Sequence, residues 1–332
     1  MATSHDVARL AGVSQPTVSR ALRDDPRVSE ATKQQVRAAA AALGYAPNAI
    51  GRALSTGRST RVGLVVTDLH NQFYQHVIAP MHDELTKQGY ELLLITESSE
   101  SAPVADHVVA NGLCGVILTT TILGSVLPVR LQDRQVPFVY FNRTARNVEA
   151  DSVTVDPVPG VTELVKAVAD FGHTRIGAVF GPQNTSTGEV REQAVRDLLQ
   201  DKGITLLSRN VLHGPFDFET GRSGAAKLLD RSDPPTLILC GNDVVALGVL
   251  DAAVERGIDV PGRLSVVGFD DLPSSAWAFV QLSTVAYDLE EMSREAARLL
   301  IARVEGRSAT VPQHTVFDTW YVPRATLGPA AG

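Results

Sequence analysis

The chain has 332 residues, of which 44% are hydrophobic and 20% charged, and its formal net charge is −7. This length suits two or three compact units, and the mixed composition excludes a disordered or low-complexity protein. No apolar run reaches the roughly 18 residues that span a bilayer. The first residues, MATSHDVARLAG, contain no apolar signal core, so a cytoplasmic location is expected.

Charge is distributed unevenly along the chain. Residues 1–60 contain eight Lys and Arg against four Asp and Glu, which gives +4, so the remaining 272 residues carry −11. A small basic head on an acidic body indicates that a nucleic acid, if bound, meets the head alone. The two cysteines, Cys114 and Cys240, lie in apolar runs without further ligands at metal spacing, which predicts buried reduced thiols.

Two short helices are predicted at the start of the chain. Thr3 and Asp6 have capping-box spacing, so a first helix is expected to run to about Ala11. Gly12 permits a left-handed turn, and Ser14 is a favourable N-cap for a second helix. The pattern therefore predicts a helix-turn-helix.

The second helix presents polar side chains at its front. Pro16 falls in the first turn, where a missing N–H loses no intrahelical bond. Gln15, Thr17, Ser19 and Arg20 lie on outward faces, as in a recognition helix inserted in the major groove. Glutamine pairs bidentately with adenine and arginine with guanine, whereas serine and threonine serve bases or phosphates. A solvated helical hairpin without a nucleic-acid partner is the alternative.

A third helix and a weak segment follow. Ser29 caps the third helix and Gly44 stops it. Pro47 and Asn48 then open a short Ala/Leu segment in which Gly51 disfavours an isolated helix by about 1 kcal/mol. This segment is expected to be a linker that orders only on a partner.

Four ordered motifs identify a family resemblance. DVARLAGVSQPTVSRAL, RVSEATKQQV, LGYAPNAIGRAL and VVGFDD resemble the lac repressor family of bacterial transcription regulators, over essentially the whole chain. The resemblance implies that the linker forms a hinge helix in the minor groove, where Leu54 wedges between base pairs and kinks the duplex. Without the family resemblance, Leu54 would be interpreted as a contact between the linker and the body or as an exposed side chain. The expected DNA-contacting residues are Thr3, Ser14, Gln15, Pro16, Thr17, Ser19, Arg20, Ser29, Asn48, Arg52 and Leu54.

From residue 61 onward, strand and helix patterns alternate. The strand-like runs RVGLVVTD, YELLLITES, GLCGVILTT, VPFVYFN, RIGAVFG, TLILCGND and LSVVGFDD are nearly continuous in Val, Ile and Leu. Such strands, separated by helices, predict parallel sheets covered on both faces. So many strands favour two lobes over one sheet. The fold class is therefore an all-α helix-turn-helix domain followed by two doubly wound parallel sheets.

The resemblance implies that the second part is a two-lobed effector domain of the periplasmic-binding-protein type, crossed three times by the chain. The expected divisions are a headpiece at 1–45, a hinge at 46–60 and an effector-binding and dimerisation domain at 61–332. Within the last, the N-lobe is expected at about 61–157 and 286–314, and the C-lobe at about 158–285 and 315–332.

Polar residues gather at the predicted strand ends, where ligands of parallel α/β sheets bind. They are Asp68, Asn142 with Arg143, Asp156, Asn242 with Asp243, and Asp270 with Asp271. Asp243 and Asp271 are expected to be caps or structural partners. The resemblance adds Thr187, Arg191, Phe216 and Trp277. The full expected ligand-binding set is Asp68, Asn71, Phe73, Tyr74, Arg143, Asp156, Thr187, Arg191, Phe216, Asn242, Asp270 and Trp277.

This residue set favours a polyhydroxylated ligand. Carboxylate and guanidinium groups clasp neighbouring hydroxyls, while aromatic rings cover an apolar sugar face. A nucleobase stacked on the same rings is the open alternative. We expect a homodimeric repressor that binds palindromic operator DNA, and whose DNA affinity is set allosterically by the ligand. The chain ends without leucine heptads, which favours a dimer over a tetramer.

Other classes of function are disfavoured. The sequence contains no G-x-x-x-x-G-K-[ST], G-x-S-x-G or H-E-x-x-H motif, so no catalytic residue, metal or cofactor is expected. The remaining alternative is a cytoplasmic sugar- or nucleobase-binding protein whose basic head serves assembly rather than operator recognition.

Overall fold

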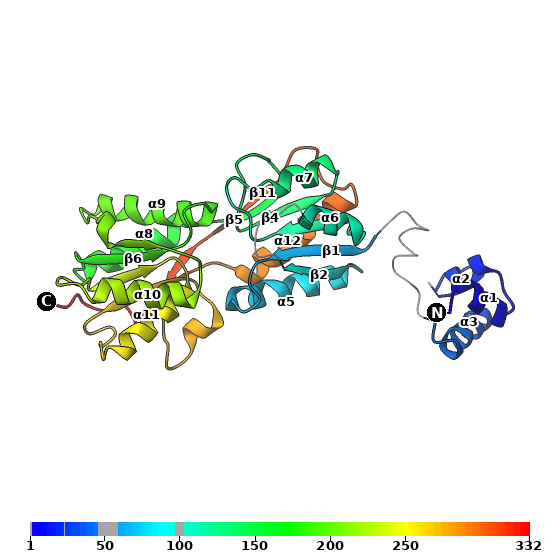
Figure 1. The fold of residues 1–332 in the computed structure, drawn as a ribbon, viewed down its shortest axis with the longest axis horizontal. Helices are drawn as coiled ribbons and strands as arrows, with labels where there is room; N and C mark the ends of the chain where they lie inside the picture. The colour runs from blue at the N-terminus through cyan, green and yellow to red at the C-terminus, as the bar shows by residue number, and fades with distance from the viewer. Residues whose placement is uncertain (1, 23, 46–58, 97–102) are drawn as a thin grey trace. The chain divides into compact units, whose positions relative to one another are not determined.

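The computed structural model describes residues 2–22, 24–45, 59–96 and 103–332. The chain divides into two compact units, Met1–Thr60 and Arg61–Gly332 (Figure 1). Within the described residues, no helix has the length and apolarity that a membrane crossing requires.

The first unit is all-α, as predicted. Its helices are α1 (Ser4–Leu10), α2 (Gln15–Ala21) and α3 (Glu30–Ala42). Their core joins Val7, Val18 and Val36 with alanines from all three helices. The predicted capping box is present, because Thr3 Oγ1 accepts from Asp6 N at 3.3 Å and Asp6 Oδ2 accepts from Thr3 N at 3.0 Å.

The turn between α1 and α2 follows the sequence prediction with one difference. Gly12 has a φ of +60° and Pro16 lies in the first turn of α2. Ser14 occupies the N-cap position, but its hydroxyl bonds the Thr17 hydroxyl at 2.8 Å and caps no backbone N–H.

The second unit begins with a six-stranded parallel sheet of order β11-β5-β4-β3-β1-β2. Helices α5 and α12 pack on one face, whereas α6 and α7 pack on the other. The bounds are β1 (Arg61–Val66), α5 (Gln72–Lys87), β2 (Glu91–Thr96), α6 (Pro103–Ala110), β3 (Gly115–Leu118), α7 (Leu127–Asp133), β4 (Phe138–Phe141), β5 (Ser152–Asp156), α12 (Leu289–Val304) and β11 (His314–Asp318).

A second six-stranded sheet has the order β12-β10-β9-β8-β6-β7, in which β12 alone runs antiparallel to its neighbour. Helices α8 and α9 cover one face, and α10 and α11 the other. The bounds are α8 (Val158–Asp170), β6 (Ile176–Phe180), α9 (Ser186–Asp201), η1 (Ser208–Asn210), β7 (Val211–His213), α10 (Phe218–Leu229), β8 (Leu237–Cys240), α11 (Asp243–Glu255), β9 (Ser265–Asp270), η2 (Pro273–Ala276), β10 (Ser283–Ala286) and β12 (Trp320–Val322). The two doubly wound sheets of the predicted fold class are thus confirmed.

Helices α10 and α11 approach each other closely at glycines. A Cβ atom added at Gly248 of α11 lies 2.0 Å from the carbonyl oxygen of Phe218, and one added at Gly221 lies 1.9 Å from that of Val245. Both neighbours are backbone atoms, so neither position has room for a side chain.

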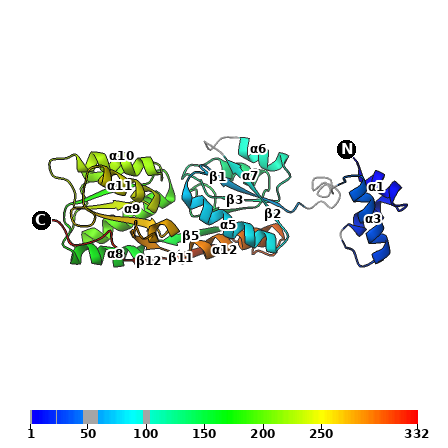
Figure 2. The same cartoon turned by 90° about the horizontal axis from the view of Figure 1, so that it is seen from below.

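The chain crosses between the two sheets after β5, between β10 and α12, and between β11 and β12 (Figure 2). The third crossing lies later than expected. We expected residues from 315 onward in the second lobe, but β11 pairs with β5 from His314 to Asp318 and so belongs to the first sheet. The Thr319 hydroxyl then joins two crossings, donating to Asp156 O and accepting from Gly160 N, both at 2.9 Å.

Two further buried details bear on stability and chemistry. His173 bonds Thr236 Oγ1 through Nδ1 and Gly328 O through Nε2, both at 2.9 Å, which anchors the C-terminal segment. Cys240 is a buried free thiol and Cys114 a half-buried one. Burial raises the pKa of the Cys114 thiol to about 11, so it stays protonated at neutral pH.

Candidate functional site

A narrow cavity of about 30 Å³ lies at the carboxyl ends of the strands, with residues from both lobes in its wall. Nine of the twelve predicted ligand-binding residues line it, and their role as ligand contacts stays a prediction. The lining residues are Asn71, Phe73, Tyr74, Thr119, Asn142, Arg143, Thr187, Arg191, Phe216, Asn242 and Asp270.

A buried ion pair forms one wall of the cavity. Arg191 Nη2 donates to Asp270 Oδ1 at 2.9 Å, and the two side chains are only 7% and 2% exposed. Arg191 Nη1 donates to Gly241 O at 2.8 Å, and its guanidinium lies 3.8 Å from the centroid of the Phe269 ring. Arg191 on α9 therefore fastens the ends of β8 and β9.

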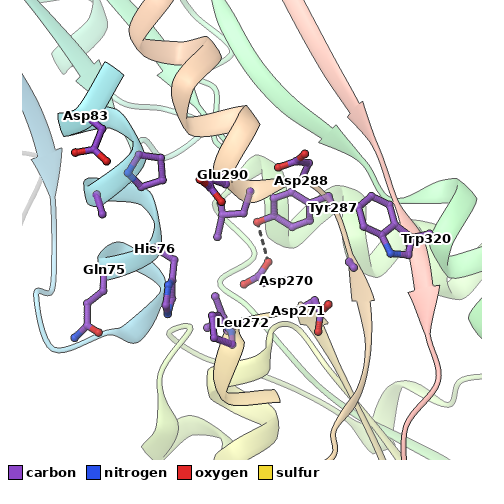
Figure 3. Close-up of a pocket in the computed structure, with 15 residues that line it drawn as sticks. Gln75, His76, Asp83, Asp270, Asp271, Leu272, Tyr287, Asp288, Glu290 and Trp320 are labelled. Atoms are coloured by element: carbon purple, nitrogen blue, oxygen red, sulfur yellow. Dashed lines mark hydrogen bonds between the residues drawn. The ribbon is translucent and has the colours of Figure 1, made fainter. Parts of the chain in front are cut away.

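The carboxylate of this pair has a second donor. Tyr287 Oη donates to Asp270 Oδ1 at 3.1 Å (Figure 3). Burial raises the pKa of Asp270, and the nearby Arg191 guanidinium opposes the rise. The pair is thus a desolvated charge site whose donors keep the carboxylate in place.

An aromatic ring lies beside the ion pair. The ring centroid of Phe216 is 5.3 Å from the Arg143 guanidinium and 5.9 Å from that of Arg191. The ring packs on Gly181, where an added Cβ would lie 2.0 Å from it. Asn71 Nδ2 donates to Phe216 O at 2.8 Å, which links the first lobe to the second. Cation–π contacts and this bond hold the ring over the cavity.

Helix caps explain how several wall residues are positioned. Asn71 is the N-cap of α5, and its Oδ1 accepts from Phe73 N at 3.0 Å. Asn242 is the N-cap of α11, and its Oδ1 accepts from Val245 N at 2.9 Å. Each asparagine therefore uses its side-chain oxygen to cap a helix, and the NH₂ group of Asn71 donates to Phe216 O.

A larger compartment of about 350 Å³ adjoins the first and shares Asn142, Thr187 and Arg191 with it. Asn142 Oδ1 is buried and has no hydrogen-bond partner within the described part of the chain. The lining is rich in hydroxyls and comprises Asn142, Thr144, Ser152, Thr154, Val155, Pro157, Ser186, Thr187, Val190, Arg191, Phe269 and His314.

Sequence reasoning missed most of the second compartment. Thr144, Ser152 and Thr154 do not stand at predicted strand ends, so a search for polar residues at those ends does not find them. Thr119 does follow a predicted strand, and the same rule finds it if threonine is admitted beside Asp and Asn.

Three predicted residues do not line either compartment. Asp68 is exposed and accepts from the N–H of His70 at 2.8 Å, closing its own turn. Asp156 accepts from Val158 N at 2.9 Å at the first crossing. Trp277 is 50% exposed, with its ring 5.7 Å from that of Phe279.

The predicted DNA-reading side chains of the first unit face solvent to different degrees. Thr3, Ser14, Pro16, Arg20 and Ser29 are exposed. Gln15, Thr17 and Ser19 are half-buried, and Gln15 Nε2 donates to Ser4 Oγ at 3.4 Å. Asn48, Arg52 and Leu54 lie outside the described residues.

These features define the class: a two-lobed receptor fold of the periplasmic-binding type, preceded by a helix-turn-helix domain. Residues 3–48 match the family model described as bacterial regulatory proteins, lacI family, and residues 165–327 match a periplasmic binding protein-like domain. The transcriptional repressor CytR of Escherichia coli (strain K12) is 32% identical over 313 residues, covering 92% of this chain and 91% of that protein. The chain therefore belongs to the lacI family of bacterial transcription regulators.

Solved structures agree with this assignment. A complex of the transcriptional regulator CelR with cellobiose is 29% identical, with a TM-score of 0.74 and coverage of 98% of this chain and 100% of that one. The lac repressor dimer bound to operator and the anti-inducer ONPF is 23% identical, with a TM-score of 0.85 and coverage of 98% of both chains. The latter match supports the fold.

Proposed function

We propose that this regulator is a homodimeric repressor whose affinity for a palindromic operator is set by a sugar bound between its lobes. Residues 1–45 act as the reading head, 46–60 as the hinge, and 61–332 as the effector-binding and dimerisation domain. The DNA contacts proposed are Thr3, Ser14, Gln15, Pro16, Thr17, Ser19, Arg20, Ser29, Asn48, Arg52 and Leu54. The effector contacts proposed are the nine predicted residues that line the narrow cavity, which we call the effector cleft together with the adjoining compartment.

One observation supports the effector class above others: the buried Arg191–Asp270 pair lies beside the Phe216 ring and a compartment rich in hydroxyls. Sugar hydroxyls both donate and accept, so they match carboxylate, guanidinium and threonine groups together, while the ring covers an apolar sugar face. The relative CelR is seen with cellobiose. A nucleobase is the second candidate, because the same ring offers a stacking surface.

The mechanism proposed is a change of lobe angle on effector binding. Asn71 of the first lobe bonds the backbone of Phe216 in the second, so a ligand between them acts on a contact that joins the lobes. A coupling of about 1–3 kcal/mol corresponds to a change of roughly 5–150-fold in operator affinity.

Dimer formation is supported by an exposed aromatic pair. Trp277 is 50% and Phe279 85% exposed, and their rings lie 5.7 Å apart. Large apolar side chains that gather on a surface mark contact sites. We expect Phe279→Asp to weaken self-association in sedimentation velocity, and an unchanged dimer would exclude this pair from the interface.

The DNA-binding part of the proposal is tested by gel shift with the upstream DNA of the regulator's own gene cluster. Arg20→Ala should abolish specific retardation, because it removes an exposed major-groove donor worth about 1–3 kcal/mol of discrimination. Arg37→Ala on α3 is the matched control, because it also removes one positive charge, but from a side chain that is paired with Asp24. Equal loss in both variants, or retardation insensitive to salt, would favour the reading in which the head only serves assembly.

The effector part is tested by calorimetry of the full chain with D-glucose, D-galactose, D-ribose, cellobiose, adenine and guanine. Phe216→Ala should weaken binding of the strongest ligand by roughly tenfold or more, since about 1.4 kcal/mol corresponds to tenfold and the variant removes ring cover. Retained operator binding in the same variant shows that the head is intact. Unchanged ligand affinity would remove Phe216 from the site.

A further inference from the structure

A buried carboxylate outside both compartments ties three segments of the second lobe together. Asp243, the first residue of α11, is fully buried. Its Oδ2 accepts from Leu272 N and from Ser275 Oγ, both at 2.7 Å, and its Oδ1 accepts from Thr284 Oγ1 at 2.6 Å. The donors come from the loop after β9, from η2 and from β10.

The first of these bonds holds a strained turn. Asp270 has a φ of +114° and Asp271 a φ of +52°, both in the region that L-residues rarely adopt. Such conformations persist only where surrounding contacts fix them. The bond from Leu272 N to Asp243 lies directly after the two strained residues. It therefore holds the turn that presents the Asp270 carboxylate to Arg191. Figure 3 shows the three consecutive residues Asp270, Asp271 and Leu272 of this turn.

The bond to Thr284 holds the other side of the same carboxylate. Strand β10 pairs with β9 so that Thr284 lies opposite Gly268 and Ala286 opposite Asp270. The next residue is Tyr287, whose hydroxyl donates to Asp270. One carboxylate thus fixes both the turn that bears Asp270 and the strand that brings its second donor.

The surroundings of Asp243 are shaped for this arrangement. A Cβ atom added at Gly268 would lie 2.2 Å from Asp243 Oδ1, so β9 leaves the space that the carboxylate occupies. The partners of Asp243 are neutral donors rather than a cation. Burial, with a contribution from the Asp270 charge, raises the pKa of Asp243 to about 7, and the three hydrogen bonds oppose this rise.

We propose that Asp243 is a positioning residue of the effector cleft, which acts through its hydrogen bonds to Leu272, Ser275 and Thr284 to hold Asp270 against Arg191 and Tyr287. The part of this inference that concerns ligand affinity rests on the proposed function of the cleft. Asp243 itself lines neither compartment.

Two substitutions at this position separate hydrogen bonding from charge. In Asp243→Asn, the amide oxygen can still accept from Leu272 N and Ser275 Oγ, and the NH₂ group can donate to Thr284, whose hydroxyl reverses. In Asp243→Ala, Leu272 N–H is left buried without this acceptor. Gly268→Ala is a third variant, because its methyl group takes the place of the carboxylate oxygen. Asp251→Ala, on the same helix, is the matched control.

The first readout is hydrogen–deuterium exchange of a peptide covering 269–276 in the full chain. We expect exchange to be roughly tenfold faster in Asp243→Ala and Gly268→Ala, and within about twofold of wild type in Asp243→Asn and Asp251→Ala. A peptide from β6 should stay protected in all variants. Wild-type protection of 269–276 in Asp243→Ala, or equal loss in the Asn and Ala variants, would overturn the positioning role.

The second readout is calorimetry with the same six compounds. For the compound that wild type binds most tightly, Asp243→Ala should weaken binding by roughly tenfold and Asp243→Asn by less than threefold. Faster exchange with unchanged affinity would overturn the link between Asp243 and the cleft. If wild type bound none of the six compounds, the proposed effector class would fail, and the exchange result would still decide whether Asp243 holds the turn.

Discussion

Replacing Arg191 by alanine should leave a buried carboxylate without its cation. Arg191 and Asp270 are 7% and 2% exposed and 2.9 Å apart, and a Tyr287 hydroxyl remains as the other donor. Breaking a buried pair from one side costs about 3–5 kcal/mol, because the charge left behind stays desolvated. The variant also loses the bond to Gly241 O and the contact with the Phe269 ring.

The charge contribution to this loss has a characteristic pH dependence. Burial already raises the pKa of Asp270, and removal of the guanidinium raises it further. A carboxyl whose folded pKa is raised destabilises the fold fully above that pKa; this penalty shrinks as pH falls below the folded pKa and is gone below the unfolded pKa. As pH falls from the Asp270 pKa of the variant to the Asp270 pKa of wild type, the difference in unfolding free energy between wild type and Arg191→Ala should shrink by about 1.4 kcal/mol per pH unit.

Urea unfolding at pH 8 and at pH 5, followed by tryptophan fluorescence, measures both effects. Arg256→Ala removes a more exposed pair with Asp230 and should cost about 0–1 kcal/mol at either pH. Arg191→Ala with Asp270→Asn removes the buried charge and should lose the pH dependence of the single variant. A cost for Arg191→Ala below about 1 kcal/mol, or the same cost at both pH values, would refute the reasoning.

Three other outcomes are expected. Gly248→Ala should lower the free energy of unfolding in urea by about 3 kcal/mol or more, because its methyl group meets a carbonyl oxygen of α10 at 2.0 Å. Gly124→Ala, whose methyl group enters open space, should be neutral, and equal effects of the two substitutions would contradict the close packing of α10 and α11. Burial lowers the pKa of His173 below 6.5, so the contribution of the neutral imidazole to stability is present above pH 6.5 and is lost as pH falls. His173→Gln should therefore flatten the plot of unfolding free energy against pH between pH 7 and 5, and an unchanged plot would contradict this. Gly181→Ala should displace the Phe216 ring and weaken effector binding with little loss of stability, which calorimetry and thermal unfolding would check together.

Much of the fold follows from periodicity in the sequence. Runs such as VGLVV in β1 and LILC in β8 carry no polar side chain because both faces of each sheet are covered, and this pattern predicted parallel strands. The third crossing was misplaced because β11 lacks this signature. Its residues His314–Asp318 alternate between exposed and half-buried positions, as an edge strand does. Composition alone does not say to which lobe such a strand belongs.

The cleft was predictable where a strand end and a helix cap coincide. Asn71 and Asn242 stand at such junctions and line the cavity, and Asp270 ends β9 there. Asp68 and Asp156 stand at similar positions, but their carboxylates close local turns, a choice between local and distant partners that sequence does not reveal. The structural role expected for Asp243 agrees with its contacts.

The hydroxyl bridge at Thr319 has a mechanical consequence. It fuses the first and third connections into one band, with the second connection alongside, so the two halves of the receptor are held at more than one point. In the proposed mechanism, a change of lobe angle would therefore have to move the first and third connections together rather than one at a time.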